Sequence, residues 1–278
     1  MSSILTNNGA MVALQTLKGI NANMARTQNE ISTGKSVATA KDNAAVWAIA
    51  KTMETDVASF KGIRDSLSMG QATVGVAREA AESITELLKE IKVKVVASQE
   101  DNVDKEKIQT DITALRDQIA TVVGAAQFNG LNMLNGEAEN PVKVLASLDR
   151  ASTGAVTASH IDVATVDLTT GGDLAALADI DVTADNGATA ALGAIDALIA
   201  TAIDAAASFG SAQKRIEIQA SFVGKLSDAM TSGIGAMVDA DMEEVSARLQ
   251  ALQVQQQLAT QSLSIANQAP QNILQLFR

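Results

Sequence analysis

The sequence lacks cysteine and tyrosine altogether, and it has one tryptophan and two prolines among 278 residues. Without cysteine there are no disulfide bonds, no thiolate nucleophiles and no cysteine-based zinc sites. Aromatic residues make up 2% of the chain, although 47% of it is hydrophobic. A core with so few rings suits thin, closely packed helical bundles better than a thick globular core. Because proline is confined to positions 141 and 270, very long helices are permitted.

Basic residues are also scarce, with 21 Lys and Arg against 32 Asp and Glu and a formal net charge of −11. Proteins that bind nucleic acid contact phosphate through Lys and Arg, so we expect no nucleic-acid partner. No uninterrupted run of about 18 apolar residues is present, which predicts no membrane-spanning segment. The N-terminus has neither the basic start nor the long apolar run of a secretory signal, which taken alone favours the cytosol.

The C-terminal stretch 242–278 carries the a/d pattern of a coiled coil. Its seam positions follow steps of four and three residues: Val245, Leu249, Leu252, Gln256, Ala259, Leu263, Ala266, Pro270, Ile273 and Phe277. Gln256 and Pro270 are the two irregular positions. Asp241 with Glu244 three residues later predicts the helix start, because carboxylates accept hydrogen bonds from free backbone amides there. No charged residue occurs between Leu249 and Phe277, so we expect this helix to lie in a crowded protein interior rather than in bulk water.

The N-terminal stretch repeats the same spacing, and it is uncharged from residue 2 to residue 16. Its predicted seam positions are Ala10, Leu14, Leu17, Asn21, Met24, Gln28 and Ile31. We therefore expect the two ends of the chain to pair as helices along a common seam, with the first helix stopped near Gly34.

The segments between the two ends predict further helices and a short β region. Helical periodicity extends over 42–98, 107–127 and 191–230, with a polar turn at 99–104 and a loosened stretch at 233–235. Asn-Gly pairs at 129–130 and 135–136 predict tight turns. Strands are expected at 141–144, 161–163 and 166–168, and turns at 171–172 and 186–187. The prediction is thus a mainly α, elongated, coiled-coil-like helical bundle built from both chain ends, with a small central segment that contains a β-hairpin.

Several motifs at both ends of the chain resemble those of bacterial flagellin, the subunit of the flagellar filament. They are 266–274 (ANQAPQNIL), 239–244 (DADMEE), 31–35 with 40–45 (ISTGK and AKDNAA), 128–130 (FNG) and 134–136 (LNG). Asn43 stands where the family usually has a second Asp, and the middle of the chain does not match. The resemblance implies inner paired helices (residues 1–35 and 240–278), a helical rod (36–136 and 190–239) and a variable, exposed, partly β segment (137–189).

This resemblance also implies the function. A flagellin assembles head-to-tail with copies of itself into a helical filament for swimming. The self-assembly seam would comprise Leu14, Leu17, Met24, Ile31, Val245, Leu249, Leu252, Leu263, Ile273 and Phe277. Its other partners would be the flagellar export machinery, a secretion chaperone, the filament cap and junction proteins. Export without a cleaved signal peptide would place the protein outside the cell, which overrides the cytosolic expectation.

In some flagellins an immune receptor reads the outer face of the first long helix, centred on an arginine. Glu90 aligns with that arginine, so the charge is reversed and recognition by the receptor is not expected.

Other candidate sites are better explained by structure. The stretch 34–36 (GKS) resembles the end of a phosphate-binding loop, but Asn29 stands where the pattern needs glycine, and a helix stop explains it better. His160 is the only histidine and has no companion for catalysis or metal binding. The carboxylates at 239–244 suit helix capping better than cation binding. We expect no enzyme activity, no metal and no cofactor.

Two alternatives were weighed. A hook–filament junction protein has similar terminal helices, and the close C-terminal match favours the filament subunit over it. A generic intracellular coiled-coil scaffold would carry charges to the very ends of its helices, which the uncharged termini contradict.

Overall fold

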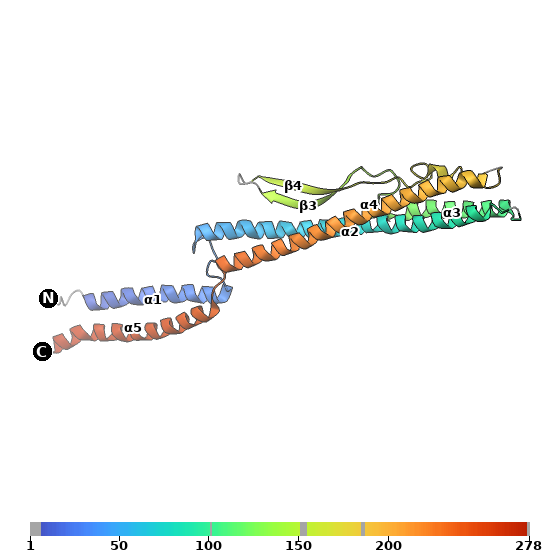
Figure 1. Ribbon diagram of the computed structural model, residues 1–278. Helices are drawn as coiled ribbons and strands as arrows, with labels where there is room; N and C mark the ends of the chain where they lie inside the picture. The colour runs from blue at the N-terminus through green and yellow to red at the C-terminus, as the bar shows by residue number, and fades with distance from the viewer. Residues whose placement is uncertain (1–6, 101, 151–154, 185–186, 277–278) are drawn as a thin grey trace. The chain divides into compact units, whose positions relative to one another are not determined.

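The computed structural model describes residues 7–100, 102–150, 155–184 and 187–276, with side chains as far as Gln268. It falls into two compact units, one formed by residues 1–57 with 229–278 and the other by residues 58–228. Five α-helices and two small antiparallel β pairs occupy the described residues (Figure 1). Two of the helices, α2 (Ala44–Ala97) and α4 (Gly187–Val238), contribute residues to both units.

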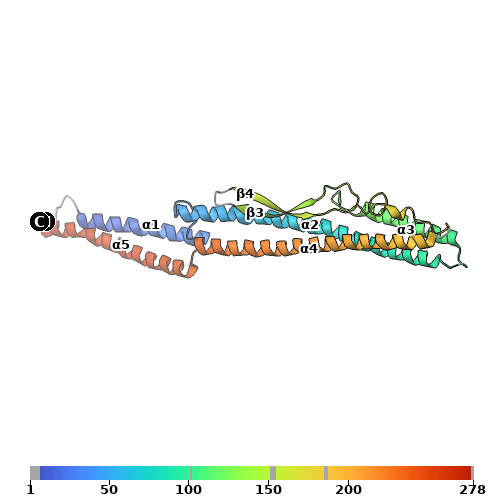
Figure 2. The ribbon, with the colours of Figure 1, turned by 45° about the horizontal axis from the view of Figure 1, so that its top comes forward.

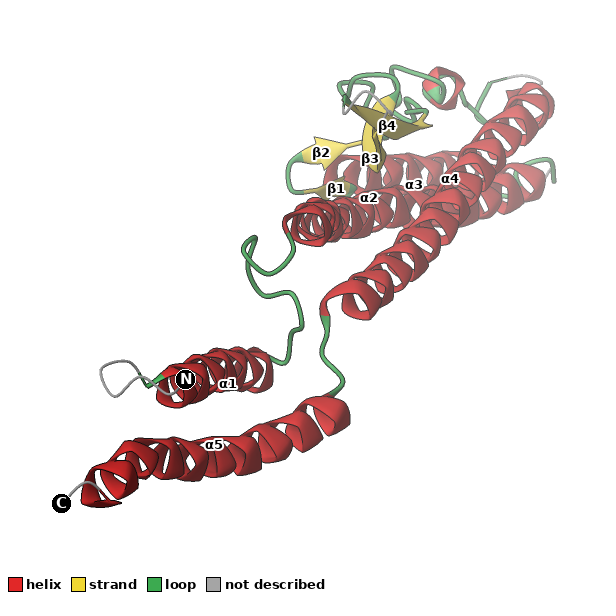
Figure 3. Cartoon of the chain, turned by 90° about the vertical axis from the view of Figure 1, so that its left-hand side faces the viewer, coloured by secondary structure: helices red, strands yellow, loops and turns green. Residues whose placement is uncertain are grey.

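In the first unit the two ends of the chain pair as helices. Helix α1 (Asn8–Thr33) and helix α5 (Met242–Leu276) lie side by side and antiparallel (Figures 1 and 3). Asn7 caps α1, since its side chain accepts a hydrogen bond from the Ala10 amide at 3.0 Å. Gly34 ends the helix in the left-handed conformation, with φ of 69°, and its amide donates to the Glu30 carbonyl at 2.9 Å.

The predicted start of the last helix is confirmed. The Asp241 carboxylate accepts hydrogen bonds from the amides of Glu243 and Glu244, at 3.0 and 3.2 Å. Glu244 does not complete the reciprocal capping box that its spacing allows. Its carboxylate instead binds Arg248 one turn later, at 2.6 Å.

The seam between the two helices follows the predicted register on α5 and a different one on α1. On α5 the less exposed positions, as far as the side chains are described, are Val245, Leu249, Leu252, Gln256, Ala259, Leu263 and Ala266. On α1 they are Ala10, Ala13, Leu17, Ile20, Met24, Thr27, Glu30 and Ile31.

Leu14 was therefore wrongly placed on the intramolecular seam, together with Gln28, while Asn21 lies at the exposed edge of the seam. The Leu14 side chain is 44% exposed, and Ala13 turns inward instead. Both sets of positions are spaced by three and four residues, so the spacing alone allows either phase. Ile20 and Thr27 are the less polar choices over Asn21 and Gln28, and they set the phase that buries more apolar surface.

The two links that lead from the terminal helices into α2 and α4 are hydrogen-bonded to each other within the first unit. The Ser36 amide donates to the Val238 carbonyl at 2.7 Å, and the Ala240 amide donates to the Gly34 carbonyl at 3.0 Å. Lys35 and Asp239 form an antiparallel β-bridge between these two bonds. The loosened stretch expected at 233–235 is wrong, because α4 continues as a regular helix to Val238.

The second unit is a bundle of α2, α3 (Lys105–Ala125) and α4, which run alongside one another (Figure 2). The predicted α2 seam is confirmed from Phe60 to Val95, where the positions spaced by three and four residues are buried. On α4 the core residues include Ile195, Phe209, Ile216 and Val223. Arg78 on α2 joins the two long helices, since its Nε donates to Gln213 Oε1 at 3.0 Å.

A β-hairpin packs on this bundle. Strands β3 (Val142–Arg150) and β4 (Val156–Val163) pair antiparallel with a bulge between Leu145 and Ser147. A side-chain amide on α4 holds it, because Gln219 donates to the Ala146 carbonyl at 3.0 Å. Two-residue strands β1 (Gln127–Phe128) and β2 (Leu131–Asn132) flank Asn129-Gly130, both with positive φ, as the predicted tight turn requires.

The strand predictions were too short and in one case wrong. The strands expected at 141–144 and 161–163 are ends of longer strands, while 166–168 forms an isolated bridge between Asp167 and Asn135. The amides of Val166 and Leu168 donate to the carbonyls of Met133 and Leu134. A 3₁₀ turn, η1 (Ala175–Leu177), follows. The turn expected at 186–187 lies partly outside the described residues, and α4 begins at Gly187 rather than near 191.

One helix, α4, is long and apolar enough to cross a membrane by length and composition alone, since an 18-residue window reaches a mean hydropathy of 1.6. Its buried residues recur every three or four positions, namely Ala191, Ile195, Leu198, Ala202, Ala205 and Phe209. This one-sided burial is typical of a bundle helix.

Candidate functional site

The predicted seam residues are brought together on α1 and α5, with the exception described above. Val245 and Leu252 are buried, at 5% and 7% exposure. Leu17, Met24, Ile31, Leu249 and Leu263 are half-buried in the same pair of helices. The side chain of Ile273 and the whole of Phe277 lie outside the described residues.

Two of the polar positions in the predicted seams meet each other across the helix pair. Gln256 Nε2 donates to Asn21 Oδ1 at 2.8 Å. Nearer the chain ends, Asn7 Nδ2 donates to the Ala266 carbonyl at 2.7 Å while the same side chain caps α1. These neutral hydrogen bonds fix the register of the antiparallel pair without placing a charge on it.

The outer side of α5 beyond Arg248 carries apolar side chains without charges. On α5 the residues Val254, Leu258 and Ile265 are 56%, 56% and 68% exposed. They are four and seven residues apart, so they form one stripe on the side of α5 opposite to the seam. We call these three residues the α5 outer stripe. On the start of α1, whose residues 8–17 are uncharged, Met11 and Val12 are also exposed, at 63% and 64%.

An exposed apolar surface without charges on two packed helices is unusual for a surface that faces water. The sequence indicated that α5 lacks charges, but not that apolar side chains are exposed on the side opposite to the seam. The signal was available, because the α5 outer stripe follows its own spacing of four and seven residues beside the a/d seam.

The junction beside this pair contains a groove of about 590 Å³, lined by the C-terminal half of α1 and the following loop. Arg26 and Glu30 form an ion pair there at 3.9 Å. The Thr39 amide and hydroxyl both donate to Asp42, at 2.9 Å each, and these bonds lower the pKa of the Asp42 carboxyl. The groove thus holds mixed, largely paired charges and does not select a ligand of one sign.

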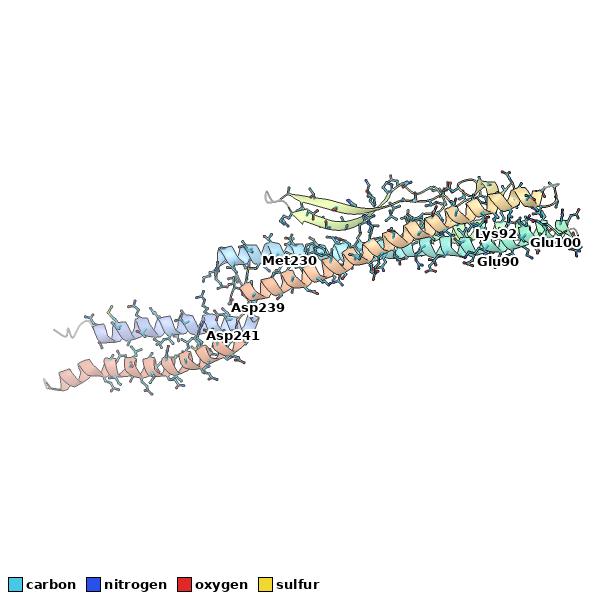
Figure 4. All side chains as sticks on the ribbon, viewed as in Figure 1. Glu90, Lys92, Glu100, Met230, Asp239 and Asp241 are labelled. Carbon is cyan, nitrogen blue, oxygen red and sulfur yellow. The ribbon has the colours of Figure 1, made fainter. Side chains whose placement is uncertain are left out.

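The remaining sequence candidates lie as follows. His160 is exposed on β4, opposite Leu145. Glu90 is exposed on α2 (Figure 4). Lys92, which points away from it, forms an ion pair with Asp196 of α4 at 2.6 Å. Asp239 and Asp241 flank the turn between α4 and α5 (Figure 4). Among the residues described, no three His, Asp or Glu side chains cluster closely enough to hold a metal ion.

Comparison with known proteins agrees with this architecture at both chain ends. The bacterial flagellin N-terminal helical region matches residues 4–139, and the bacterial flagellin C-terminal helical region matches residues 192–277. The chain belongs to the bacterial flagellin family. Flagellin C of Rhizobium meliloti (strain 1021) is similar to it, with 38% identity over 322 residues and all of both chains covered. Flagellin FljK of Caulobacter vibrioides is 40% identical over 281 residues, which cover 100% of this chain and 99% of the relative.

A solved structure supports the fold. A protein described as flagellar hook-associated, from Vibrio parahaemolyticus, superposes with a TM-score of 0.54 and 16% identity. The match covers 71% of this chain and 100% of that one. At this identity the likeness concerns the fold alone, so it does not favour the junction-protein alternative.

As a flagellin, the chain is a structural subunit that self-assembles into the bacterial flagellar filament, outside the cell. The named relatives are flagellins over their full length, which favours the filament subunit over the hook–filament junction protein.

Proposed function

We propose that the paired helices α1 and α5 carry the filament's self-association, with the α5 outer stripe and the uncharged start of α1 (residues 8–17) as the surface that packs against other copies. The observation that supports this most strongly is the exposed apolar stripe on a helix pair with no charge on α5 beyond Arg248 up to Phe277. Burial of that stripe would favour association, since apolar surface removed from water contributes about 25 cal/mol per Å².

The absence of charge suits a helical polymer. In a filament each side chain recurs in every subunit, so a charge on a packed face meets its own copies. At a separation of about 10 Å and an effective dielectric constant of about 20, each such pair costs about 1.7 kcal/mol. Gln, Ser, Asn and Thr avoid this repulsion and still form hydrogen bonds. The association is heterologous rather than two-fold, which generates open filaments.

The layers follow from this proposal. Residues 1–35 and 240–278 form the inner layer, 36–136 and 190–239 form the rod around it, and 137–189 form the outer surface. Both family matches leave residues 140–191 unmatched, which supports the assignment of that segment to the part that differs among flagellins. We assign no catalytic role to any of the three parts.

Family membership further supports export through the flagellar export machinery with a secretion chaperone, without cleavage of a signal peptide, and contact with filament cap and junction proteins. The N-terminal family match begins at residue 4, and we propose that the exported protein keeps this matched region intact. Mass spectrometry of the protein from sheared filaments tests this, and an N-terminus well beyond residue 4 would contradict it.

The proposed self-association surface is tested by electron microscopy of the purified full-length chain beside a chain that ends at Asp241. We expect filaments from the full-length chain alone. Because α5 begins at Met242, the shorter chain keeps α2, α3 and α4, and its helical content serves as the control for folding. Filaments from both chains would overturn the proposal.

Glu90 leads to a proposal about host recognition. Its carboxylate is exposed on α2 where the resemblance places an arginine, so we propose that the immune receptor for flagellin does not respond to this chain. A cell-based receptor assay tests this, with a reactive flagellin as the positive control and Glu90→Arg as the matched variant. Strong activation by the unaltered chain would refute it.

A further inference from the structure

The outward side of α4 in the second unit exposes two large apolar side chains. Ile218 and Phe222 are 60% and 57% exposed, one helical turn apart. Other phenylalanines of this unit behave differently, since Phe209 is fully buried and Phe60 is 8% exposed. The buried neighbours Ile216 and Val223 face the bundle, so Ile218 and Phe222 point away from it. Two adjacent large apolar side chains, one of them aromatic in a chain with 2% aromatics, make this part of α4 a candidate contact surface.

Basic side chains surround this apolar pair. Arg215 precedes Ile218 by three residues and Lys225 follows Phe222 by three, so both lie on the same side of the helix and both are exposed. Within the described part of the chain, no ion pair is formed by either of them. Lys214 is neutralised by Glu217 at 2.9 Å. We call Arg215, Ile218, Phe222 and Lys225 the α4 patch, and its net charge is positive on an otherwise acidic protein.

The opposite charge gathers on residues 137–184 of the same unit, which hold eight acidic and two basic residues, a net charge of −6. Asp173, Asp179 and Asp181 are all exposed around η1. Asp181 is held in its charged form, because hydrogen bonds from the Thr183 hydroxyl and amide lower the pKa of its carboxyl. Arg116 of α3 contacts the backbone beside these aspartates, since its guanidinium donates to the Ala178 carbonyl at 3.5 Å.

The α4 patch cannot meet residues 173–181, which we call the acidic stretch, within one chain. Gln109 of α3 holds residues 180–182, since its side-chain amide donates to the Ile180 carbonyl at 2.9 Å and accepts from the Val182 amide at 3.0 Å. The acidic stretch therefore lies at the end of the unit where α4 begins. Phe222 lies 35 residues beyond Gly187, which is about 50 Å along the helix at about 1.5 Å per residue.

We propose that the α4 patch of one copy docks on the acidic stretch 173–181 of a second copy. The two surfaces are different and far apart on one unit, so the contact is heterologous and repeats from copy to copy. It rests on the self-assembly proposed above and adds a contact between second units to the packing of α1 and α5. Charge complementarity favours a second copy of this chain as the occupant. The net charge of −11 makes copies repel one another, and the contact between the basic α4 patch and the acidic stretch offsets that repulsion locally.

Charge reversal with rescue tests the contact. Lys225→Glu and Asp179→Lys should each raise the critical concentration for seeded polymerisation roughly three- to tenfold, because an attraction is replaced by a repulsion. The chain that carries both substitutions should return to within about twofold of the unaltered chain. Lys61→Glu, an exposed reversal on α2, is the control for net charge. Circular dichroism melts of the monomers separate folding from assembly. An equal effect of Lys61→Glu, or no rescue in the double variant, would overturn the proposed contact.

Cross-linking gives a second readout, and the absence of native cysteine keeps it free of background. Filaments of the Phe222→Cys, Asp179→Cys chain, oxidised and then denatured without reductant, should run as a ladder of covalent oligomers. Each single variant should stay monomeric. Monomer alone from filaments of the double variant would refute the contact. If the unaltered chain forms no filaments, the self-assembly proposal fails instead, so the two failures are distinguishable.

Discussion

Shortening Leu258 to alanine separates the role of the α5 outer stripe in the monomer from its role in the filament. The Leu258 side chain is 56% exposed in the single chain, so Leu258→Ala should change the free energy of unfolding of the monomer by well under about 1 kcal/mol. Burying a whole leucine side chain is worth about 1.5–3 kcal/mol. If the filament buries the exposed half, the substitution costs assembly about 1 kcal/mol, which is roughly a fivefold rise in critical concentration.

The matched control is Leu252→Ala, six residues earlier on the same helix. Leu252 is 7% exposed against α1, so its truncation should destabilise the helix pair by about 2–3 kcal/mol. Thermal melts of the monomers and sedimentation of seeded filaments measure both effects. We expect Leu252→Ala to change the melt and Leu258→Ala to change mainly the critical concentration. A Leu258→Ala chain that melts and assembles like the unaltered protein would refute the claim that this stripe is buried in the filament.

Three further predictions concern the rod and the junction. Gly70→Ala should lower the melting temperature, because the new Cβ would lie 2.5 Å from Cγ1 of buried Val144 in the β3–β4 hairpin. Gly62→Ala should raise the melting temperature instead, because nothing lies within 4 Å of its Cβ and alanine is favoured over glycine by about 1 kcal/mol in a helix. Gln109→Ala should destabilise the protein by about 1–3 kcal/mol and speed amide exchange at Val182, while exposed Gln118→Ala should do neither. The pKa of Asp42 is lowered in the folded chain, so its stabilisation of the loop is present above the ordinary value of 3.8 and is lost as the pH falls through the folded pKa. The Thr39 amide chemical shift should therefore titrate with a midpoint below pH 3.8.

The long helices and much of their packing could be predicted from sequence because their apolar spacing leaves little choice. On α2 the predicted seam from Phe60 to Val95 is buried, and on α5 the seam from Val245 to Ala266 has the predicted register. On α1 two phases compete, since Ala13 and Leu14 are both apolar. The observed phase turns Ile20 and Thr27 inward rather than Asn21 and Gln28, a difference in polarity that spacing alone does not weigh.

The links and the β-hairpin were less predictable for a different reason. Two glycines at 233 and 235 suggested a break, yet α4 continues to Val238. Beyond that point, backbone hydrogen bonds from Ser36 to Val238 and from Ala240 to Gly34 stabilise the junction. The hairpin strands extend through Ser147, Asp149, Ser159 and His160, whose polar side chains hide the alternation on a largely exposed sheet. In both places contacts distant in sequence override the local propensity.

The central claim, that filament assembly depends on the uncharged outer face of α5, is tested most directly at Val254. This residue is 56% exposed in the α5 outer stripe, and Val254→Glu and Val254→Gln differ in charge but hardly in shape. The measurement is the critical concentration for seeded polymerisation at low and high salt. The account predicts that Val254→Gln assembles with a modest penalty, whereas Val254→Glu fails at low salt and partly recovers when salt screens the repeated charge. Equal critical concentrations for the two variants at low salt would contradict it.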